Sequence, residues 1–301
     1  MITISLTQGL GNQLFQYFFG ESLRIEFQNN IEVNYLNDLL PPEQIKLWEL
    51  FDLEINWIDK TKLKKNFLFD LSPKNRNFIL NFYKILRLNY SSLLIDDLYF
   101  DSSSLKTYKD TYFRGYWQNY NFIKKNFDKI SKKIKFKKKL SLNKLIKYKT
   151  NKIKHTTIIG VHVRGGDYLL NQNRLLKNDI NADYYINSMN LMKSIFDQPL
   201  FLLFTDDFQY LKNLNISKNF DCINIFDISN ERDDDFQYLS QCNNFIIPNS
   251  TFSLWAFYLN NHENKFILTP DTWYSFKKNC IDNFIEKKYL KMKYDYIKKY
   301  F

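Results

Sequence analysis

The stretch Gly160-Val161-His162-Val163-Arg164-Gly165-Gly166-Asp167-Tyr168 indicates both the fold of this chain and the place of its binding site. It continues an apolar, β-branched run that begins at residue 157, which is typical of a short buried strand. In a parallel α/β sheet, ligands bind at the carboxyl ends of the strands. An arginine at such an end, beside glycines that let a ligand approach the backbone, predicts a site for a phosphate-bearing substrate.

Apolar runs recur through the second half of the chain and alternate with helix-like segments. This alternation predicts a parallel sheet with covering helices. A polar cluster follows each run, so we expect the strand ends to meet at one edge of the sheet. The expected strands are residues 157–163, 200–204, 222–226, 245–247 and 266–268, and the expected helices lie around 183–195, 207–213, 235–241 and 252–260.

The first half opens in the same manner, with an alternating strand over residues 2–6, a glycine turn and a helix-like stretch over 14–27. The turn Gly9-Leu10-Gly11 lacks the third glycine of a dinucleotide fingerprint, because Leu14 stands in its place. We expect it to serve close backbone approach. The chain thus predicts two Rossmann-like domains, residues 1–150 and 151–301, that face each other across a cleft.

The net charge of +11 is local to one segment. From Lys124 to Lys154 the chain has 14 lysines and one acid, which leaves 29 of the 43 basic and 31 of the 32 acidic residues outside it. A smaller basic excess lies in the tail, over residues 286–301. We expect the lysine-rich segment to be helical. Both segments are consistent with solvated helix faces or with contact with an anionic membrane surface. We expect no nucleic-acid partner, because no binding motif accompanies the lysines.

The composition also limits the compartment. Three cysteines without metal-ligand spacing make a disulfide framework improbable and favour a reducing environment. The N-terminus lacks a basic leader, and no run of about 18 apolar residues is present. These features predict a cytoplasmic protein that associates with the inner face of the plasma membrane at most peripherally.

Arg164 is the strongest candidate for binding phosphate, because its planar guanidinium matches phosphate oxygens. A structural salt bridge to Asp167 or Asp206 is the alternative. His162 stands two residues earlier, so its side chain shares a face of the strand with Arg164. It either joins the same ligand site or is a packed core residue.

The segment Asn249-Ser250-Thr251-Phe252-Ser253 is expected to open a helix. Asn249 or Ser250 suits the N-cap position, and the amide groups of the first turn form an anion site to which Thr251 or Ser253 would contribute. The acidic pair in Thr205-Asp206-Asp207 could hold a metal, bind a nucleobase or cap a helix. The Asp-x-Asp spacing in Asp233-Asp234-Asp235 is a weak metal signal, since carboxylates favour helix starts in any case.

These motifs together resemble the bacterial α-1,2-fucosyltransferases of glycosyltransferase family 11. The likeness runs from one end of the chain to the other, and several motifs in one order are far more specific than any single one. The motifs are Gly9-Leu10-Gly11-Asn12-Gln13-Leu14-Phe15-Gln16-Tyr17, Gly115-Tyr116-Trp117-Gln118, His162-Val163-Arg164-Gly165-Gly166-Asp167-Tyr168, Phe204-Thr205-Asp206-Asp207, Asn249-Ser250-Thr251-Phe252-Ser253-Leu254-Trp255-Ala256 and Pro270-Asp271-Thr272-Trp273.

The resemblance implies a GT-B fold, with residues 1–150 on the acceptor side and residues 151–301 binding the donor. It implies GDP-β-L-fucose as donor, inversion to an α-1,2 linkage, and no metal or other cofactor. The implied acceptor is a galactose-type hydroxyl of a surface oligosaccharide or lipid-linked glycan, as in O-antigen or polysaccharide biosynthesis. The rival hypotheses are another GDP-sugar or fucosyl linkage, and a non-enzymatic polyanion- or membrane-binding module.

On this hypothesis, Arg164 and the helix start at Ser250, Thr251, Phe252 and Ser253 bind the diphosphate and stabilise the leaving phosphate. Asp206 and His162 would hold guanine or ribose, and Gly11 and Asn12 would contact the donor from the other domain. Asp167 is the candidate general base; it either has that role or braces its loop, and transfer without a strong enzymic base is the alternative.

One departure from the family's motifs matters for the site. The family usually has His-x-Arg-Arg-Gly-Asp, and this chain has Gly165 in place of the second arginine. The change removes a charge and is expected to loosen the loop. Arg164 matches the first arginine, so we expect catalysis to be retained.

Overall fold

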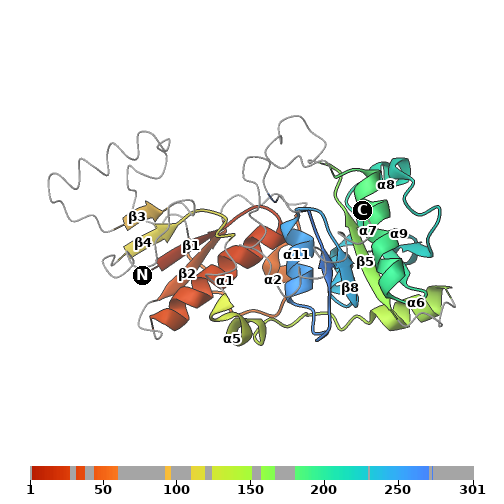
Figure 1. Cartoon of the computed structure of the whole chain (residues 1–301). Helices are drawn as coiled ribbons and strands as arrows, with labels where there is room; N and C mark the ends of the chain where they lie inside the picture. Colours follow the sequence, from red (N-terminus) through yellow and green to blue (C-terminus); the bar gives the residue numbers. More distant parts are fainter. Residues whose placement is uncertain are drawn as a thin grey trace. The chain divides into compact units, whose positions relative to one another are not determined.

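The computed structural model describes residues 2–27, 32–37, 44–59, 92–95, 110–118, 124–150, 157–166, 180–229, 231–270 and 273. The chain divides into two compact units, Met1–Lys137 and Lys138–Phe301 (Figure 1). The predicted boundary near residue 150 falls inside the second unit. Within the described ranges, no helix has the length and apolar character needed to cross a membrane.

The first unit contains a parallel sheet in the order β2-β1-β4-β3. Helix α1 packs against β1 and β2 because Leu14, Phe15 and Phe18 on its inner face are fully buried. The predicted first strand and the helix after it are therefore confirmed. The strands are β1 (Ile2–Leu6), β2 (Val33–Asn37), β3 (Ser92–Ile95) and β4 (Asp110–Phe113), and the helices are α1 (Leu10–Glu26), α2 (Leu47–Leu50) and α5 (Phe127–Ser131).

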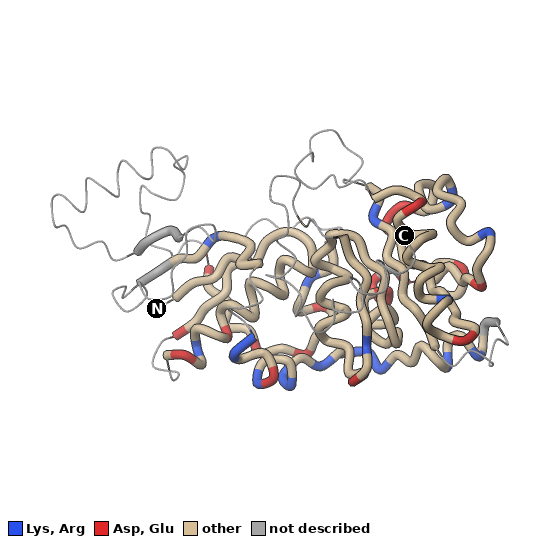
Figure 2. Tube along the Cα trace, in the orientation of Figure 1, with Lys and Arg blue, Asp and Glu red and all other residues tan. Residues whose placement is uncertain are grey.

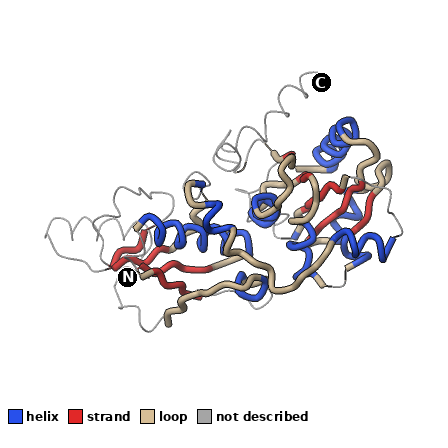
Figure 3. The backbone as a smooth tube through the Cα atoms, turned by 90° about the horizontal axis from the view of Figure 1, so that it is seen from below, coloured by secondary structure: helices blue, strands red, loops and turns tan. Residues whose placement is uncertain are grey.

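The second unit contains a parallel sheet in the order β7-β6-β5-β8-β9, among helices that Figure 3 shows around it. The strands are β5 (Ile158–Val163), β6 (Leu200–Thr205), β7 (Cys222–Asn224), β8 (Asn244–Ile246) and β9 (Ile267–Leu268). The helices are α6 (Leu142–Thr150), α7 (Ala182–Ile195), α8 (Phe208–Leu214), α9 (Ile225–Ile228), α10 (Asp235–Leu239) and α11 (Thr251–Tyr258), with a 3-10 turn, η6 (Arg232–Asp234).

Side chains alternate across β5, and both faces of the strand are covered. Ile159, Val161 and Val163 join a buried cluster with Tyr185 and Met189 of α7. The other face is covered by α10 and the start of α11: a Cβ built at Gly160 would meet Leu239 and Cys242, and His162 contacts Ser253. Burial on both faces explains the continuous apolar run that predicted this strand.

Two predictions about local structure are wrong. Residues 225–228 form helix α9, although the apolar run predicted strand as far as 226, since hydrophobicity alone does not separate the two. The lysine-rich segment is not one helix: it contains α5 and α6, and between these two helices Phe136 forms an antiparallel bridge with Phe51. The predicted α/β class, with a parallel sheet in each half, is confirmed. The facing of the two domains across a cleft stays a prediction.

Candidate active site

The strand order of the second unit places a topological switch between β5 and β8. The chain runs outward from β5 through β6 to β7 and then continues at β8, on the other side of β5. Ligands of open α/β sheets bind at the carboxyl edge of such a switch, because the loops diverge there and leave a crevice. Arg164 follows β5 at this edge, and α11 follows β8. The structure therefore brings two of the predicted phosphate-binding features to one switch point.

Arg164 and the two glycines after it are held by the two acids that follow β6. Its Nη1 lies 2.5 Å from Asp206 Oδ2, which is one of the salt bridges foreseen as an alternative role. The amide of Gly165 donates to Asp206 Oδ1 at 2.8 Å, and the amide of Gly166 donates to Asp207 Oδ2 at 3.4 Å. The loop is thus fixed to β6 rather than loose over these residues. The salt bridge is compatible with phosphate binding, because a guanidinium has five donors and the Arg164 side chain keeps 28% exposure.

His162 is buried and joins β5 to the first turn of α11. Its Nδ1 lies 2.9 Å from Ser253 Oγ, which also lies 3.3 Å from the carbonyl oxygen of Ser250. Burial lowers the pKa of His162 from its ordinary 6.5 to about 4, an effect that Asp206 opposes and Arg164 strengthens. The imidazole is therefore neutral at pH 7. Its burial agrees with the packed-core alternative, and its predicted contact with guanine or ribose stays a prediction.

The start of α11 has no side-chain cap. Ser250 occupies the N-cap position without a capping hydrogen bond from its side chain. Asn249 Nδ2 instead donates to the carbonyl oxygen of Trp273 at 2.9 Å. Ser250 thus takes the predicted N-cap position, but the predicted side-chain capping hydrogen bond is not formed. A first turn without a side-chain cap presents backbone amides and the positive end of the helix dipole, which favour an anion.

The other residues of this turn are held tightly. The hydroxyl of Ser253 is buried against His162, and the ring of Phe252 lies 5.5 Å from the imidazole and 5.2 Å from the ring of Phe236. Trp255, further along α11, is fully buried. The helix start is thus rigidly placed, as a preorganised anion site requires.

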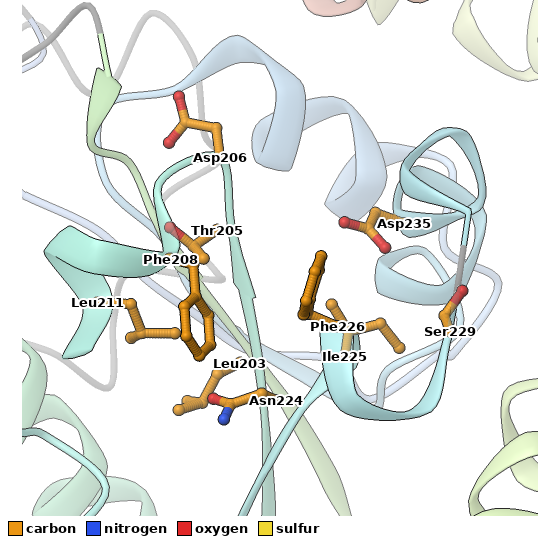
Figure 4. Close-up of a pocket in the computed structure, with 10 residues that line it drawn as sticks. All are labelled: Leu203, Thr205, Asp206, Phe208, Leu211, Asn224, Ile225, Phe226, Ser229 and Asp235. Carbon is orange, nitrogen blue, oxygen red and sulfur yellow. The ribbon is translucent and has the colours of Figure 1, made fainter.

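A pocket opens beside this switch point, between the ends of β6 and β7 (Figure 4). The rings of Phe208 and Phe226 lie across it, with centroids 5.6 Å apart, although the two side chains are 45% and 71% exposed. Figure 4 shows the carboxylate of Asp235 directed toward this space and the carboxylate of Asp206 pointing away from it. Its lining is Leu203, Thr205, Asp206, Phe208, Leu211, Asn224, Ile225, Phe226, Ser229 and Asp235.

Sequence reasoning missed the aromatic part of this pocket. Phe208 opens α8 and Phe226 lies in α9, where the apolar run predicted strand. The available signal was the polar cluster that follows each of these runs. Asp206 was predicted for the site, and it lines the pocket while also holding Arg164.

The three acids of the Asp-x-Asp motif have separate surroundings. Asp234 is buried and pairs with Lys138 at 2.8 Å, whereas Asp235 lines the pocket and Asp233 is exposed. Asp207 caps α8 by accepting from the amide of Tyr210 at 2.9 Å, as one alternative foresaw. Across the described residues, no group of three or more His, Cys, Asp or Glu side chains could hold a metal ion. Independence from metal stays a prediction.

The remaining predicted residues lie elsewhere. Gly11 and Asn12 are in the first turn of α1 in the first unit, where Asn12 Oδ1 accepts from Gln118 Nε2 at 2.8 Å. Asp167 lies outside the described residues, so its role as general base stays a prediction.

The sequence of the whole chain is similar to that of known proteins. Its sequence matches the family described as Glycosyl transferase family 11 over residues 1–298. The chain belongs to glycosyl transferase family 11. The resemblance and the prediction of a glycosyltransferase are both confirmed.

Several proteins similar to this chain are named as glycosyltransferases. The chain is 26% identical to Alpha-1,2-colitosyltransferase of Escherichia coli over 91% of this chain and 92% of that protein. It is 25% identical to O-antigen biosynthesis glycosyltransferase WbnK of Escherichia coli, over 90% and 94% of the two chains. Galactoside 2-alpha-L-fucosyltransferase SEC1 of Bos taurus is 30% identical over 37% of this chain and 31% of its own length. Family membership and these relatives support fucosyl transfer that forms an α-1,2 linkage.

The chain also has a likeness to a solved structure. POFUT1 in complex with GDP aligns with a TM-score of 0.48 and 10% identity, over 89% of this chain and 98% of that chain.

Proposed function

We propose that this family 11 enzyme transfers L-fucose from GDP-β-L-fucose to a galactose-type hydroxyl of a surface glycan, with inversion to an α-1,2 linkage. The observation that carries the proposal is that Arg164 and the start of α11 lie at the same topological switch point, next to an aromatic pocket. A cation and a helix start suit a diphosphate, and a flat aromatic pocket suits a nucleobase.

The diphosphate is assigned to the space between Arg164 and the first turn of α11. Departure of GDP leaves charge on the β-phosphate in the transition state. A guanidinium held by Asp206 and amides fixed by a buried helix stabilise that charge without having to reorganise, which is usually the largest catalytic effect. The buried hydroxyl of Ser253 contacts His162, so we assign the contacts in this turn to the backbone amides and to Thr251.

The guanine base is assigned to the pocket over β6 and β7. One face of the base would pack against the ring pair Phe208–Phe226, whose rings are too close together to enclose it from both sides. Guanine has two neighbouring N–H donors on one edge, and a carboxylate accepts from both. Asp235 is assigned to that contact, because it lines the pocket beside the two rings, whereas Asp206 holds Arg164 and the amide of Gly165.

The acceptor hydroxyl attacks the anomeric carbon of fucose from the face opposite GDP, which inverts the configuration. Asp167 is proposed to take the proton of that hydroxyl. Asn12 is proposed to contact the diphosphate or the sugar from the first unit. The acceptor itself is proposed to be an oligosaccharide or a lipid-linked glycan of O-antigen biosynthesis, since WbnK is named for that process.

One observation favours a second donor. Alpha-1,2-colitosyltransferase is similar to this chain over nearly its whole length. GDP-linked colitose is therefore the second candidate, with the same linkage and the same nucleotide site.

A donor panel tests the proposal. Purified protein is incubated with GDP-fucose, GDP-colitose, GDP-mannose and UDP-galactose, together with galactose-terminated acceptors, and the products are analysed by mass and linkage. We expect an α-1,2-fucosyl product, inhibition by GDP but not by ADP or UDP, and unchanged rates in EDTA. Transfer of colitose alone would favour the second donor, and consumption of no GDP-sugar would overturn the proposal.

We also propose peripheral contact with the anionic inner face of the plasma membrane, through the lysines between Lys124 and Lys154 and the C-terminal tail. The tail and residues 151–154 lie outside the described residues. Figure 2 shows basic residues recurring along the described segment, and the lysines from Lys124 to Lys147 are exposed. Lys125 pairs with Glu26 and Lys133 with the buried Glu21, both at 3.7 Å, and Lys138 pairs with Glu231 and Asp234. These three lysines are therefore left out of the test.

Vesicle binding tests this contact. Replacing Lys129, Lys132 and Lys135 by Gln should weaken binding to phosphatidylserine vesicles by roughly a hundredfold, since each lysine contributes about 1 kcal/mol. The matched control replaces Lys193, Lys212 and Lys218, which are exposed elsewhere in the described chain. Transfer to a soluble acceptor should survive in both variants. Equal vesicle binding by the two variants would contradict the proposal.

A further inference from the structure

Three amide side chains, Gln8, Asn12 and Gln118, meet at the carboxyl edge of the first sheet, and we call them the amide cluster. Asn12 Oδ1 accepts from Gln118 Nε2 at 2.8 Å, and Asn12 Nδ2 lies 3.5 Å from Gln8 Oε1. Gln8 follows β1, and Gln118 follows β4. The chain continues from β1 to its neighbour β2 on one side, and β4 lies on the other side of β1. The switch point of this sheet is therefore between β1 and β4, where a ligand site is expected.

The backbone on both sides of the cluster is fixed by two buried glutamines of α1. Gln13 Nε2 donates to the carbonyl oxygen of Gln8 at 2.7 Å. Gln16 Nε2 donates to the carbonyl oxygen of Gly115 at 2.9 Å, while its Oε1 accepts from the amide of Thr7. Both glutamines are fully buried. The loops that carry Gln8 and Gln118 are therefore held in register with the first turn of α1.

The same loops have unusual backbone conformations. Gln8 has φ +63° and Trp117 has φ +54°, in the left-handed region that non-glycine residues rarely adopt. The ring of Trp117 is buried and stacks on Phe19 with centroids 4.0 Å apart, which holds this turn in place. Strain of this kind persists only where surrounding packing maintains it, and it concentrates at binding and catalytic sites. Here its result is the approach of Gln118 to Asn12.

We propose that Gln118 is a positioning residue that fixes the amide orientation of Asn12 and so presents the NH₂ group of Asn12 to the donor. An asparagine side chain has an oxygen that accepts hydrogen bonds and an NH₂ group that donates them. A diphosphate oxygen only accepts, so it requires the NH₂ group. Both contacts within the cluster favour that orientation, since Gln118 donates to the oxygen and Gln8 accepts from the nitrogen. The inference rests on the proposed function, which places Asn12 at the donor.

An acceptor-only side chain at position 118 tests the inference. In Gln118→Glu the carboxylate only accepts, so Asn12 must turn its NH₂ group toward residue 118 and its oxygen toward the donor. We expect KM for GDP-fucose to rise about tenfold to a hundredfold, the range for a lost hydrogen bond to a charged group. The thermal unfolding midpoint and the kcat at saturating donor should change little.

Gln8→Glu is the matched control for charge. It adds the same negative charge next to Asn12, but an oxygen at position 8 still accepts from Asn12 Nδ2 as Gln8 Oε1 does. The difference in KM between the two variants therefore measures the effect of the Asn12 amide orientation, with the effect of the added charge removed. Gln118→Met removes the hydrogen bond without adding charge, and we expect a KM increase of roughly threefold to tenfold, as for a lost neutral hydrogen bond. This variant keeps the test valid if Gln118→Glu fails to fold.

The outcomes separate the inference from the proposed function. Equal KM increases in Gln118→Glu and Gln8→Glu, or an unchanged KM in Gln118→Met, would overturn the role of Gln118 while the wild-type enzyme still transfers fucose. A wild-type protein that consumes no GDP-sugar would instead overturn the proposed function. Non-additivity between Asn12→Ala and Gln118→Glu would support the inference, because a positioning residue has no effect once its target is removed.

Discussion

Replacing Arg164 by alanine should lower fucosyl transfer about a hundredfold or more while the protein remains folded. The variant removes the cation nearest the proposed leaving phosphate, and loss of one preorganised donor typically costs about 2.7–4 kcal/mol in the transition state. The stability effect should be small, because the salt bridge to Asp206 is partly exposed and the amide of Gly165 still donates to that carboxylate. The measurements are kcat with GDP-fucose and the thermal unfolding midpoint.

Two further variants test whether this loss comes from the guanidinium itself. Arg164→Lys keeps the charge but loses the planar fork, so an intermediate rate is expected. Asp206→Asn keeps an oxygen for the amide of Gly165 and removes the ionic partner of Arg164, so its loss should be smaller than that of Arg164→Ala. If Arg164→Ala retained more than about a tenth of the wild-type rate, the assigned role of Arg164 would be wrong.

The switch point of the second unit could be predicted from the sequence because its features are local. The apolar run of β5, the residues after it and the helix start at Ser250 each follow from a short pattern of residues. The partner of Arg164 could not be predicted, since Asp206 comes from β6 and Asp167 was an equal candidate on spacing alone. Only the register of β5 beside β6, which pairs Val163 with Thr205, brings Asp206 to the guanidinium.

The pocket and the missing cap show the same limit. Phe226 belongs to a four-residue helix that tertiary packing selects over a strand, so its exposed ring could not be placed from periodicity. Asn249 is a favourable N-cap residue by type, yet its amide bonds to Trp273, which lies 24 residues later. Preferences of single residues gave way to contacts between distant segments at both positions.

Restoring the arginine that the family usually has at position 165 should harm this enzyme. A Cβ built at Gly165 lies 2.5 Å from Asp207 Cβ, closer than real Cβ atoms approach. Asp207 cannot withdraw easily, because its side chain caps α8 at Tyr210 and its amide donates to Thr205 Oγ1 at 3.0 Å. We expect Gly165→Arg to lose about 1–3 kcal/mol in the free energy of unfolding, as overpacked sites do.

Transfer should fall with stability in Gly165→Arg, because the displaced loop carries Arg164 away from the start of α11. Since the clash begins at Cβ, Gly165→Ala should lose nearly as much stability as Gly165→Arg. Gly9→Ala is the matched control: no atom lies within 4 Å of a Cβ there, and we expect a loss under about 1 kcal/mol. Urea unfolding and kcat/KM for GDP-fucose measure both effects. A Gly165→Arg variant with unchanged stability and tighter donor binding would show that the contact between Gly165 and Asp207 does not restrict this position, and that the second arginine is simply missing.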